Sequence, residues 1–302
     1  ANQDTGMPFV RLYIPKKAQA DLLEDLPNRL KTWQSAHMVY PDDKLHKIKV
    51  RHRGDNPINW LYTTKSWRVK TRKGRMIERV RKFNYIKFQE ADYLTHILSY
   101  KIHARLGLTT QKARLVELFI NDTSNGLYLE IEKLDESFLR NNNLMPTNLY
   151  KGEQYNTERI YGQEHDLFNN PALWKKVAVF NQLPKDDYSD LARLFTLIKR
   201  AKTDETAFAD LTRIARFKDW AGFSAFQTLA QSWGNDYRHN MRLISDPWKG
   251  TVRPLPHDTG SGVRSPAPFR FVLGRPPLLR PGLPPTRSRA TRSENGARML
   301  ES

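Results

Sequence analysis

Two short stretches near the end of the chain contain the residue types that phosphoryl transfer requires. The first reads Asn-Asp236-Tyr-Arg-His-Asn240, and the second ends in His-Asp258-Thr-Gly260. Phosphoryl transfer needs a carboxylate to orient and deprotonate the attacking hydroxyl, and hard oxygen ligands to hold Mg²⁺ on the phosphates. In this interpretation Asp236 is the base, Asn240 and Asp258 are metal ligands, and Gly260 permits a sharp turn.

The same residues also suit ordinary loops, because Asp and Asn are frequent in turns. Taken by themselves, the two stretches leave both interpretations open. A zinc site is discounted, since the chain has no Cys and His96, His103 and His165 lack metal-ligand spacing. For His239, next to the first stretch, we predict a structural hydrogen bond.

The segments that precede and connect the two stretches must bring them together. Apolar spacing predicts helices near 171–182, 187–200, 204–215 and 217–233. Strands are predicted at 148–151, 241–244 and 251–255. The last two strands would form a pair that places Asn240 and Asp258 close together, in a part of the chain that is mostly helical.

The first half of the chain has the apolar alternation of β-strands. Strands are predicted at 8–14, 47–53, 66–70 and 83–88, with a hairpin formed by 114–120 and 127–132 and signalled by its Asn125-Gly126. Helices are predicted at 16–35 with an interruption at Pro27, at 90–106 before Gly107, and from Asp135 to Leu139. A β-rich part followed by an α-rich part indicates the α+β class.

The chain is strongly basic, with a formal net charge of +18 and a pI of about 10. Residues 65–82 hold nine Lys or Arg and one acid. Such a charge favours polyanionic partners, among them nucleic acid and nucleotide phosphates. A nucleic-acid-binding protein would use this run with Trp67, Phe83 and Tyr85 for base stacking. That function ranks second, because it leaves the patterns at 120–151 and 236–260 unexplained.

Several residues of the first half could contact a nucleotide. Lys65 and Lys70 lie on a predicted strand, where one of them would place its charge on the phosphates. Being five residues apart, they point to opposite faces of that strand. Lys151 is a further candidate for the cleft. The alternative is that the 65–82 run is a solvated surface.

Two more pairs belong to the same predicted nucleotide site. Arg51 and Arg53 next to Gly54 could bring cations and an open backbone to phosphate. Glu130 and Glu132 alternate on one strand and therefore share a face, from which one could pair with a lysine or contact the nucleotide. Structural ion pairing is the alternative for at least one of the two.

Matching segments occur in the order found in one known family. They are Arg-His-Arg-Gly54, Lys65-Ser-Trp-Arg-Val-Lys70, Gly126-Leu-Tyr-Leu-Glu-Ile-Glu132, Asn-Leu-Tyr-Lys151, His-Asn240 and Pro-His-Asp258. Over about residues 8–262 the chain resembles the CotH kinase family of spore-coat proteins. The resemblance implies an atypical protein-kinase-like two-lobed fold within residues 1–262, with an N-lobe of about 1–133 and a C-lobe of about 134–262. It also implies ATP, Mg²⁺ or Mn²⁺, and phosphorylation of Ser or Thr in a coat or secreted protein.

The resemblance also implies roles for single residues. Asp258 matches the metal-binding Asp of the family, Asn240 matches the Asn of its His-Asn pair, and Lys65 matches the phosphate lysine better than Lys70. The family's catalytic Asp aligns with Asn235, and we prefer Asp236 because an amide cannot act as a base. Asn235 in place of Asp, and a tail in place of the helices that the family has after the metal site, leave a catalytically inactive pseudokinase scaffold as an alternative. Gly260, where relatives commonly have another Asp, is a further departure from the family.

The last forty residues differ in composition from the rest of the chain. Residues 263–302 contain seven Pro and eight Arg but no Lys, and they show no periodicity. We expect this tail to be disordered. A shifted reading frame is one hypothesis for its origin, which sibling genes continuing in frame past Gly262 would support and siblings with the same tail would contradict.

The sequence also leads to an expectation about the compartment. No run approaches the roughly 18 apolar residues of a membrane span. Ala1 in place of Met, together with the resemblance, leads us to expect an exported, mature form with its signal peptide removed.

Overall fold

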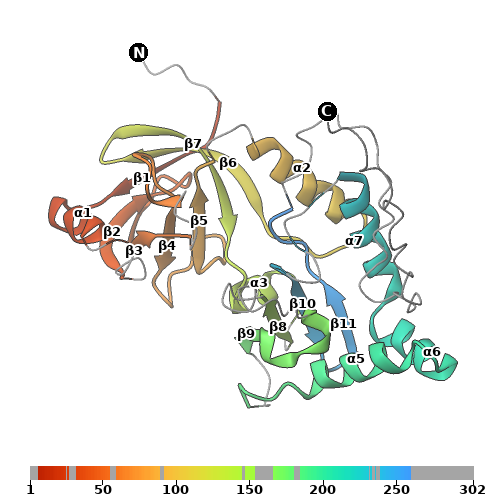
Figure 1. Cartoon of the computed structure of the whole chain (residues 1–302). Helices are drawn as coiled ribbons and strands as arrows, with labels where there is room; N and C mark the ends of the chain where they lie inside the picture. Colours follow the sequence, from red (N-terminus) through yellow and green to blue (C-terminus); the bar gives the residue numbers. More distant parts are fainter. Residues whose placement is uncertain are drawn as a thin grey trace, which may run out of the picture.

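The computed structural model of the 302-residue chain describes residues 6–24, 26, 32–54, 59–88, 92–144, 147–153, 166–179, 184–230, 232, 235 and 239–259. Within them strands and helices both occur, and the first half is rich in strands, so the α+β class is confirmed. A β-barrel built by the first half lies beside a smaller sheet and a group of helices built by the second half (Figure 1). The predictions for Asp236, Gly260 and residues 263–302 lie outside the described residues.

The barrel closes through seven strands in the order β1-β2-β3-β4-β5-β7-β6. Neighbouring strands are antiparallel except β1 and β6, whose parallel pairing completes the ring. Alternate residues such as Val10 and Leu12 are fully buried inside, as the period of two requires. The strands are β1 (Phe9–Tyr13), β2 (Gln34–Val39), β3 (Leu45–His52), β4 (Trp67–Thr71), β5 (Lys82–Ile86), β6 (Ala113–Ile120) and β7 (Thr123–Glu132).

Two helices connect consecutive strands of the barrel. Helix α1 (Lys16–Leu23) connects β1 to β2, and α2 (Asp92–Arg105) connects β5 to β6 and contacts α7. Gly107 ends α2 with φ of 80°, a left-handed conformation that glycine adopts without a Cβ clash. The predicted cap is therefore confirmed.

The second half forms a four-stranded sheet in the order β11-β10-β8-β9. Its strands are β8 (Asn148–Gly152), β9 (Trp174–Val179), β10 (Arg242–Asp246) and β11 (Thr251–Pro254). Its helices are α3 (Glu136–Asn141), the short 3₁₀ helices η2 (Leu167–Asn169) and η3 (Pro171–Leu173), α5 (Ser189–Arg200), α6 (Glu205–Ile214) and α7 (Phe217–Ala230). Trp220 and Phe223 of α7 pack in the core with Tyr150 of β8, which fixes the helices on this sheet.

Three local predictions were wrong. The helix predicted at 16–35 stops at Leu23, and residues 34–39 form β2 because their alternating Ala36 and Met38 fill the barrel. Residues 174–179 form β9 instead of a helix, since they pair with β8. The hairpin turn lies at Asn121-Asp122, both with positive φ, because Ile120 pairs directly with Thr123.

Buried His103 on α2 should make the fold acid-sensitive. Its ring lies 4.0 Å from Phe226 of α7, and burial lowers the pKa of His103 to about 4. The unfolded chain, in which a histidine titrates near pH 6.5, then binds more protons between pH 6.5 and 4. The free energy of unfolding should therefore fall as the pH drops through this range, by at most about 1.4 kcal/mol per pH unit from this residue.

Urea unfolding of the wild type and of His103→Met between pH 4.5 and 7 measures this effect. The substitution should flatten the dependence of the unfolding free energy on pH, because Met has no proton to bind. An unchanged slope would show that protonation of His103 does not destabilise the fold.

Candidate functional site

The ends of β10 and β11 bring the two predicted metal ligands together. Asn240 precedes β10 and Asp258 follows β11, and the Asn240 Nδ2 donates to the Asp258 Oδ2 at 3.1 Å. Both residues have left-handed backbone conformations, with φ of 56° and 55°. Such conformations are uncommon outside glycine and cost energy, and they are concentrated at functional sites. Asp258 is exposed, so its carboxylate is accessible to a ligand.

Arg242, two residues after Asn240, supports this pair from within the sheet. Its guanidinium donates to the Asn240 Oδ1 at 3.1 Å and to the Met241 carbonyl at 3.0 Å. Burial lowers the pKa of Arg242 to about 10, against the favourable charges of Glu153 and Asp258. The side chain therefore remains a cation at neutral pH and holds the Asn240 amide in one orientation.

The end of β8 adds a second set of charges. Lys151 pairs in register with Arg242, and its Nζ lies 3.5 Å from the Glu153 Oε2. His239 hydrogen bonds to Glu153, so the structural bond predicted for His239 is present. Burial raises the pKa of Glu153, but His239, Lys151 and Arg242 outweigh it and hold the pKa below its usual value. Glu153 is thus an anion among cations.

Gly152, the last residue of β8, lies between Lys151 and Glu153 and allows close packing at this point. A Cβ at this position would lie 2.9 Å from the Trp174 ring, closer than van der Waals contact allows. Trp174 is itself buried, and its Nε1 donates to the Leu167 carbonyl at 2.7 Å. The ring cannot easily move, so glycine is required for β8 to approach β9 here.

Arg53 and His257 complete the charged cluster. Burial and the charges of Arg242, Arg53 and Lys151 hold the pKa of His257 well below its usual value. The charges of these three cations therefore act on the residue next to Asp258. The His257 Nδ1 lies 3.0 Å from the Gln111 Oε1, and the Gln111 amide donates to the Glu132 carbonyl, which links the site to the end of β7.

The two predicted phosphate lysines lie apart from this cluster. The Lys65 Nζ donates to the Tyr62 carbonyl at 2.8 Å, in the loop before β4. Lys70 points to the outer face of β4, where its Nζ lies 4.5 Å from the centre of the Trp33 ring. The structure thus gathers Arg53 and Lys151, but neither Lys65 nor Lys70, with Asn240 and Asp258.

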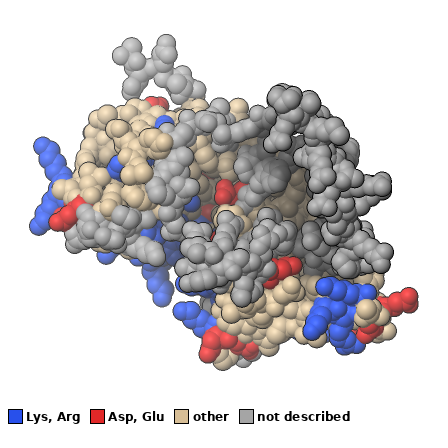
Figure 2. Space-filling view, viewed as in Figure 1, with Lys and Arg blue, Asp and Glu red and all other residues tan. Residues whose placement is uncertain are grey.

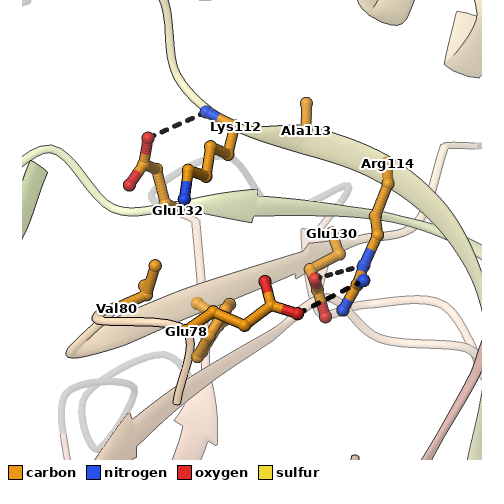
Figure 3. Close-up of a pocket in the computed structure, with 8 residues that line it drawn as sticks. Glu78, Val80, Lys112, Ala113, Arg114, Glu130 and Glu132 are labelled. Carbon is orange, nitrogen blue, oxygen red and sulfur yellow. Dashed lines mark hydrogen bonds and ion pairs between the residues drawn. The ribbon is translucent and has the colours of Figure 1, made fainter. Parts of the chain in front are cut away.

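Glu130 and Glu132 line a separate pocket of about 170 Å³ in the barrel. Figure 3 shows Arg114 between Glu78 and Glu130. The Arg114 Nη1 lies 3.7 Å from the Glu78 Oε1, and the Arg114 Nε lies 2.8 Å from the Glu130 Oε1. The backbone amide of Lys112 donates to the Glu132 Oε1 at 2.8 Å. Burial raises the pKa of both Glu130 and Glu132. The predicted structural ion pairing therefore applies to Glu130, which also accepts a hydrogen bond from buried Tyr40.

Asn235, which aligns with the family's catalytic Asp, lies in the interior. It is fully buried, and the Gln227 Nε2 donates to its Oδ1 at 2.7 Å. In this position Asn235 joins α7 to the segment before β10. Asp236 lies outside the described residues, so its role stays a prediction.

The aromatic residues proposed for base stacking are not on the surface. Trp67, Phe83 and Tyr85 are at most 8% exposed and fill the barrel. Because they alternate with basic residues on β4 and β5, their side chains point inward while the Lys and Arg side chains point outward. Interleaving in the sequence therefore places the two kinds of side chain on opposite faces of the sheet.

Three residues of the cluster were not predicted from the sequence. Arg242 could have been found, because it follows Asn240 by two residues and so shares its side of the chain. Glu153 stands in the same relation to Lys151. Gln111 has no such signal, since it lies 146 positions before His257 in the sequence.

Among the described residues no group of three or more His, Asp and Glu is arranged to hold a metal ion, and no helix is long and apolar enough to cross a membrane. A search of curated proteins gave no match. The model of one family, described as CotH kinase protein, matches residues 50–268, which is more than half of the chain and spans Arg53, Lys151, Asn240 and Asp258. The chain therefore belongs to the CotH kinase family.

Proposed function

We propose that the chain transfers the γ-phosphate of ATP to Ser or Thr of a protein substrate, using Mg²⁺ or Mn²⁺. The observation that carries this proposal is the hydrogen-bonded pair Asn240–Asp258, held in left-handed backbone conformations and supported by the buried cation Arg242. Phosphoryl transfer depends on positioning and on neutralising charge, which this arrangement can supply. Coat or secreted proteins are the substrates we infer from the family, with the enzyme itself exported.

The donor set fits a magnesium ion bound together with a nucleotide. Mg²⁺ is usually held by one or two protein carboxylates, substrate phosphates and waters, and does not need a cluster of acids. Asp258 offers an exposed carboxylate. Asn240 donates to Asp258 through its amide nitrogen and accepts from Arg242 at its amide oxygen, whose second lone pair would be the one to bind a cation. When bound, the ion would neutralise negative charge on the phosphates.

The cations of the cluster would position the phosphates. The charges of Arg53 and Lys151 act on His257, the neighbour of Asp258 in the chain. An Arg can bind two phosphate oxygens at once, and a Lys acts as a point charge. Arg242 is buried and acts as a positioning residue for Asn240. In this proposal the barrel and the helical part correspond to the two lobes of a kinase-like fold.

Asp236 is the proposed base. The buried Asn235 amide is bound to Gln227 and has no proton-accepting group of suitable basicity, so Asp236 is the carboxylate left in the expected stretch. Asp236→Asn should lower the transfer rate about 10²- to 10⁴-fold with little change in stability.

Transfer of labelled phosphate from ATP to the chain itself and to a mixed protein substrate tests this assignment. The matched variant is Asn235→Ala, which removes one of the two acceptors of the Gln227 amide and leaves the backbone carbonyl of residue 235 as the other. It should reduce stability but leave the rate of the folded fraction within about ten-fold. A full rate for Asp236→Asn would overturn the assignment. No transfer by a folded wild type would favour the pseudokinase scaffold, which thermal stabilisation by nucleotide would then test.

A further inference from the structure

The outer side of the barrel carries a dense set of cations that the proposed catalytic site does not use. We call it the basic face and define it by six residues on β3, β4 and β5: Lys47, Lys49, Arg51, Arg68, Lys70 and Lys82. Their side chains alternate with buried residues, so all six point away from the barrel interior. Figure 2 shows Lys and Arg side chains along the lower left side of the barrel.

Strand register places these cations directly opposite one another. Lys49 pairs with Lys70, Lys70 pairs with Lys82, and Arg51 pairs with Arg68. Like charges in opposite positions on neighbouring strands destabilise a sheet. These three pairs, in two adjacent rows, therefore lower the stability of the barrel, and formation of the barrel does not require them.

The electrostatic effect extends beyond the paired residues. Partial burial, followed by the charges of Arg81, Lys49, Lys82 and Arg51, lowers the pKa of Lys70. At the edge of the face, burial and the charges of Arg68 and Lys82 lower the pKa of Lys133 to about 8. The acids Asp135 and Glu136 act in the opposite direction on Lys133, and Asp135 pairs with Lys82 at 3.1 Å.

We propose that the basic face binds a protein segment that carries several phosphoserines. The source of such segments rests on the proposed function, because a Ser/Thr kinase produces them in its own substrate. An extended polypeptide presents alternate side chains about 6.6 Å apart, which matches the spacing of alternate cations along β3 and β4. Binding of a phosphorylated product segment would keep the substrate near the site for further transfer.

The structure favours a phosphorylated protein over single-stranded nucleic acid. Sequence-independent nucleic-acid binding uses exposed aromatic rings on which bases stack. The aromatic side chains of β4 and β5 are buried, and the Trp33 ring beside the face has Lys70 and Arg51 at 4.5 and 5.1 Å from its centre. The described residues of β3, β4 and β5 thus offer charge for phosphates but no exposed Trp, Tyr or Phe ring.

Binding of a fluorescent Ser-Gly repeat peptide with four phosphoserines tests the proposal on the full chain. The variant is Lys47→Glu with Lys49→Glu, two exposed residues on β3. The matched control is Lys199→Glu with Lys202→Glu, an equal charge change at the exposed end of α5. At low ionic strength the first variant should bind about ten-fold more weakly and the control within about two-fold of wild type.

Three outcomes would overturn the proposal. They are equal weakening by both variants, equal affinity for the unphosphorylated peptide, and tighter binding of single-stranded DNA with the same number of phosphates. The assay is repeated with Asp258→Asn, which should bind the peptide as the wild type does. Peptide binding without any phosphate transfer would refute the kinase function and leave the surface in place, so the two failures are distinguishable.

Discussion

Replacing Asp258 with Asn should lower the rate of phosphate transfer by at least about a thousand-fold while the chain stays folded. The substitution removes the exposed negative charge of the proposed metal site. It keeps an oxygen that can accept the hydrogen bond from the Asn240 Nδ2, now 3.1 Å from the carboxylate. Initial rates with saturating ATP and Mg²⁺, together with thermal unfolding of the same samples, measure both parts of the prediction.

Asp210→Asn is a matched control for this change. Asp210 is an acid of similar charge on the surface of α6, where it pairs with Arg213 at 2.9 Å. Its substitution should alter the rate by less than about two-fold, because surface ion pairs contribute little. Equal rates for Asp258→Asn and the wild type would contradict the role of Asp258 at the metal.

Replacing Arg242 with Met should lower both stability and activity. The substitution removes a buried cation that donates to the Asn240 Oδ1 and interacts favourably with the charges of Glu153 and Asp258. We expect a loss of about 3 kcal/mol in the free energy of unfolding. We also expect transfer by the folded fraction to fall about a hundred-fold, because the Asn240 amide is no longer fixed.

Arg242→Lys separates positioning from stability. Lysine restores the charge but not the two separate donors that reach Asn240 and the Met241 carbonyl. Stability should recover for the most part, while the Mg²⁺ concentration needed for half-maximal rate should be higher than in the wild type, because the Asn240 amide is not held in place. Full recovery of the rate and of the Mg²⁺ requirement would show that Arg242 acts only through its charge.

The pairing of Asn240 with Asp258 could be predicted because local sequence determines it. Two short apolar runs predicted β10 and β11. In an antiparallel pair the start of the first strand lies beside the end of the second, which brings the residues that flank these ends together. The barrel strands were found for the same reason, since apolar alternation has a period of two wherever one face is buried. Strand β2 was missed because a helical pattern before it was extended too far.

The rest of the site depends on contacts that no local pattern encodes. One of Lys65 and Lys70 was expected to face the cleft. Which face of their strand lies toward the site depends on how the barrel closes, and the parallel pairing of β1 with β6 completes that closure. Arg53 meets His257 only after the whole chain between them has folded. Glu130 was predicted to lie near the nucleotide because it is an acid on a strand, whereas its side chain binds Arg114 and Tyr40.

Binding of Mn²⁺ in the presence of a non-hydrolysable ATP analogue tests the central claim most directly, because it does not depend on the unknown substrate. Titration of the folded wild-type chain, followed by the electron paramagnetic resonance of free Mn²⁺, should reveal nucleotide-dependent Mn²⁺ binding that Asp258→Asn weakens at least about ten-fold. Equal Mn²⁺ affinity in the two proteins, or no nucleotide-dependent binding by the wild type, would contradict the assignment of Asn240 and Asp258 as the metal site of a kinase.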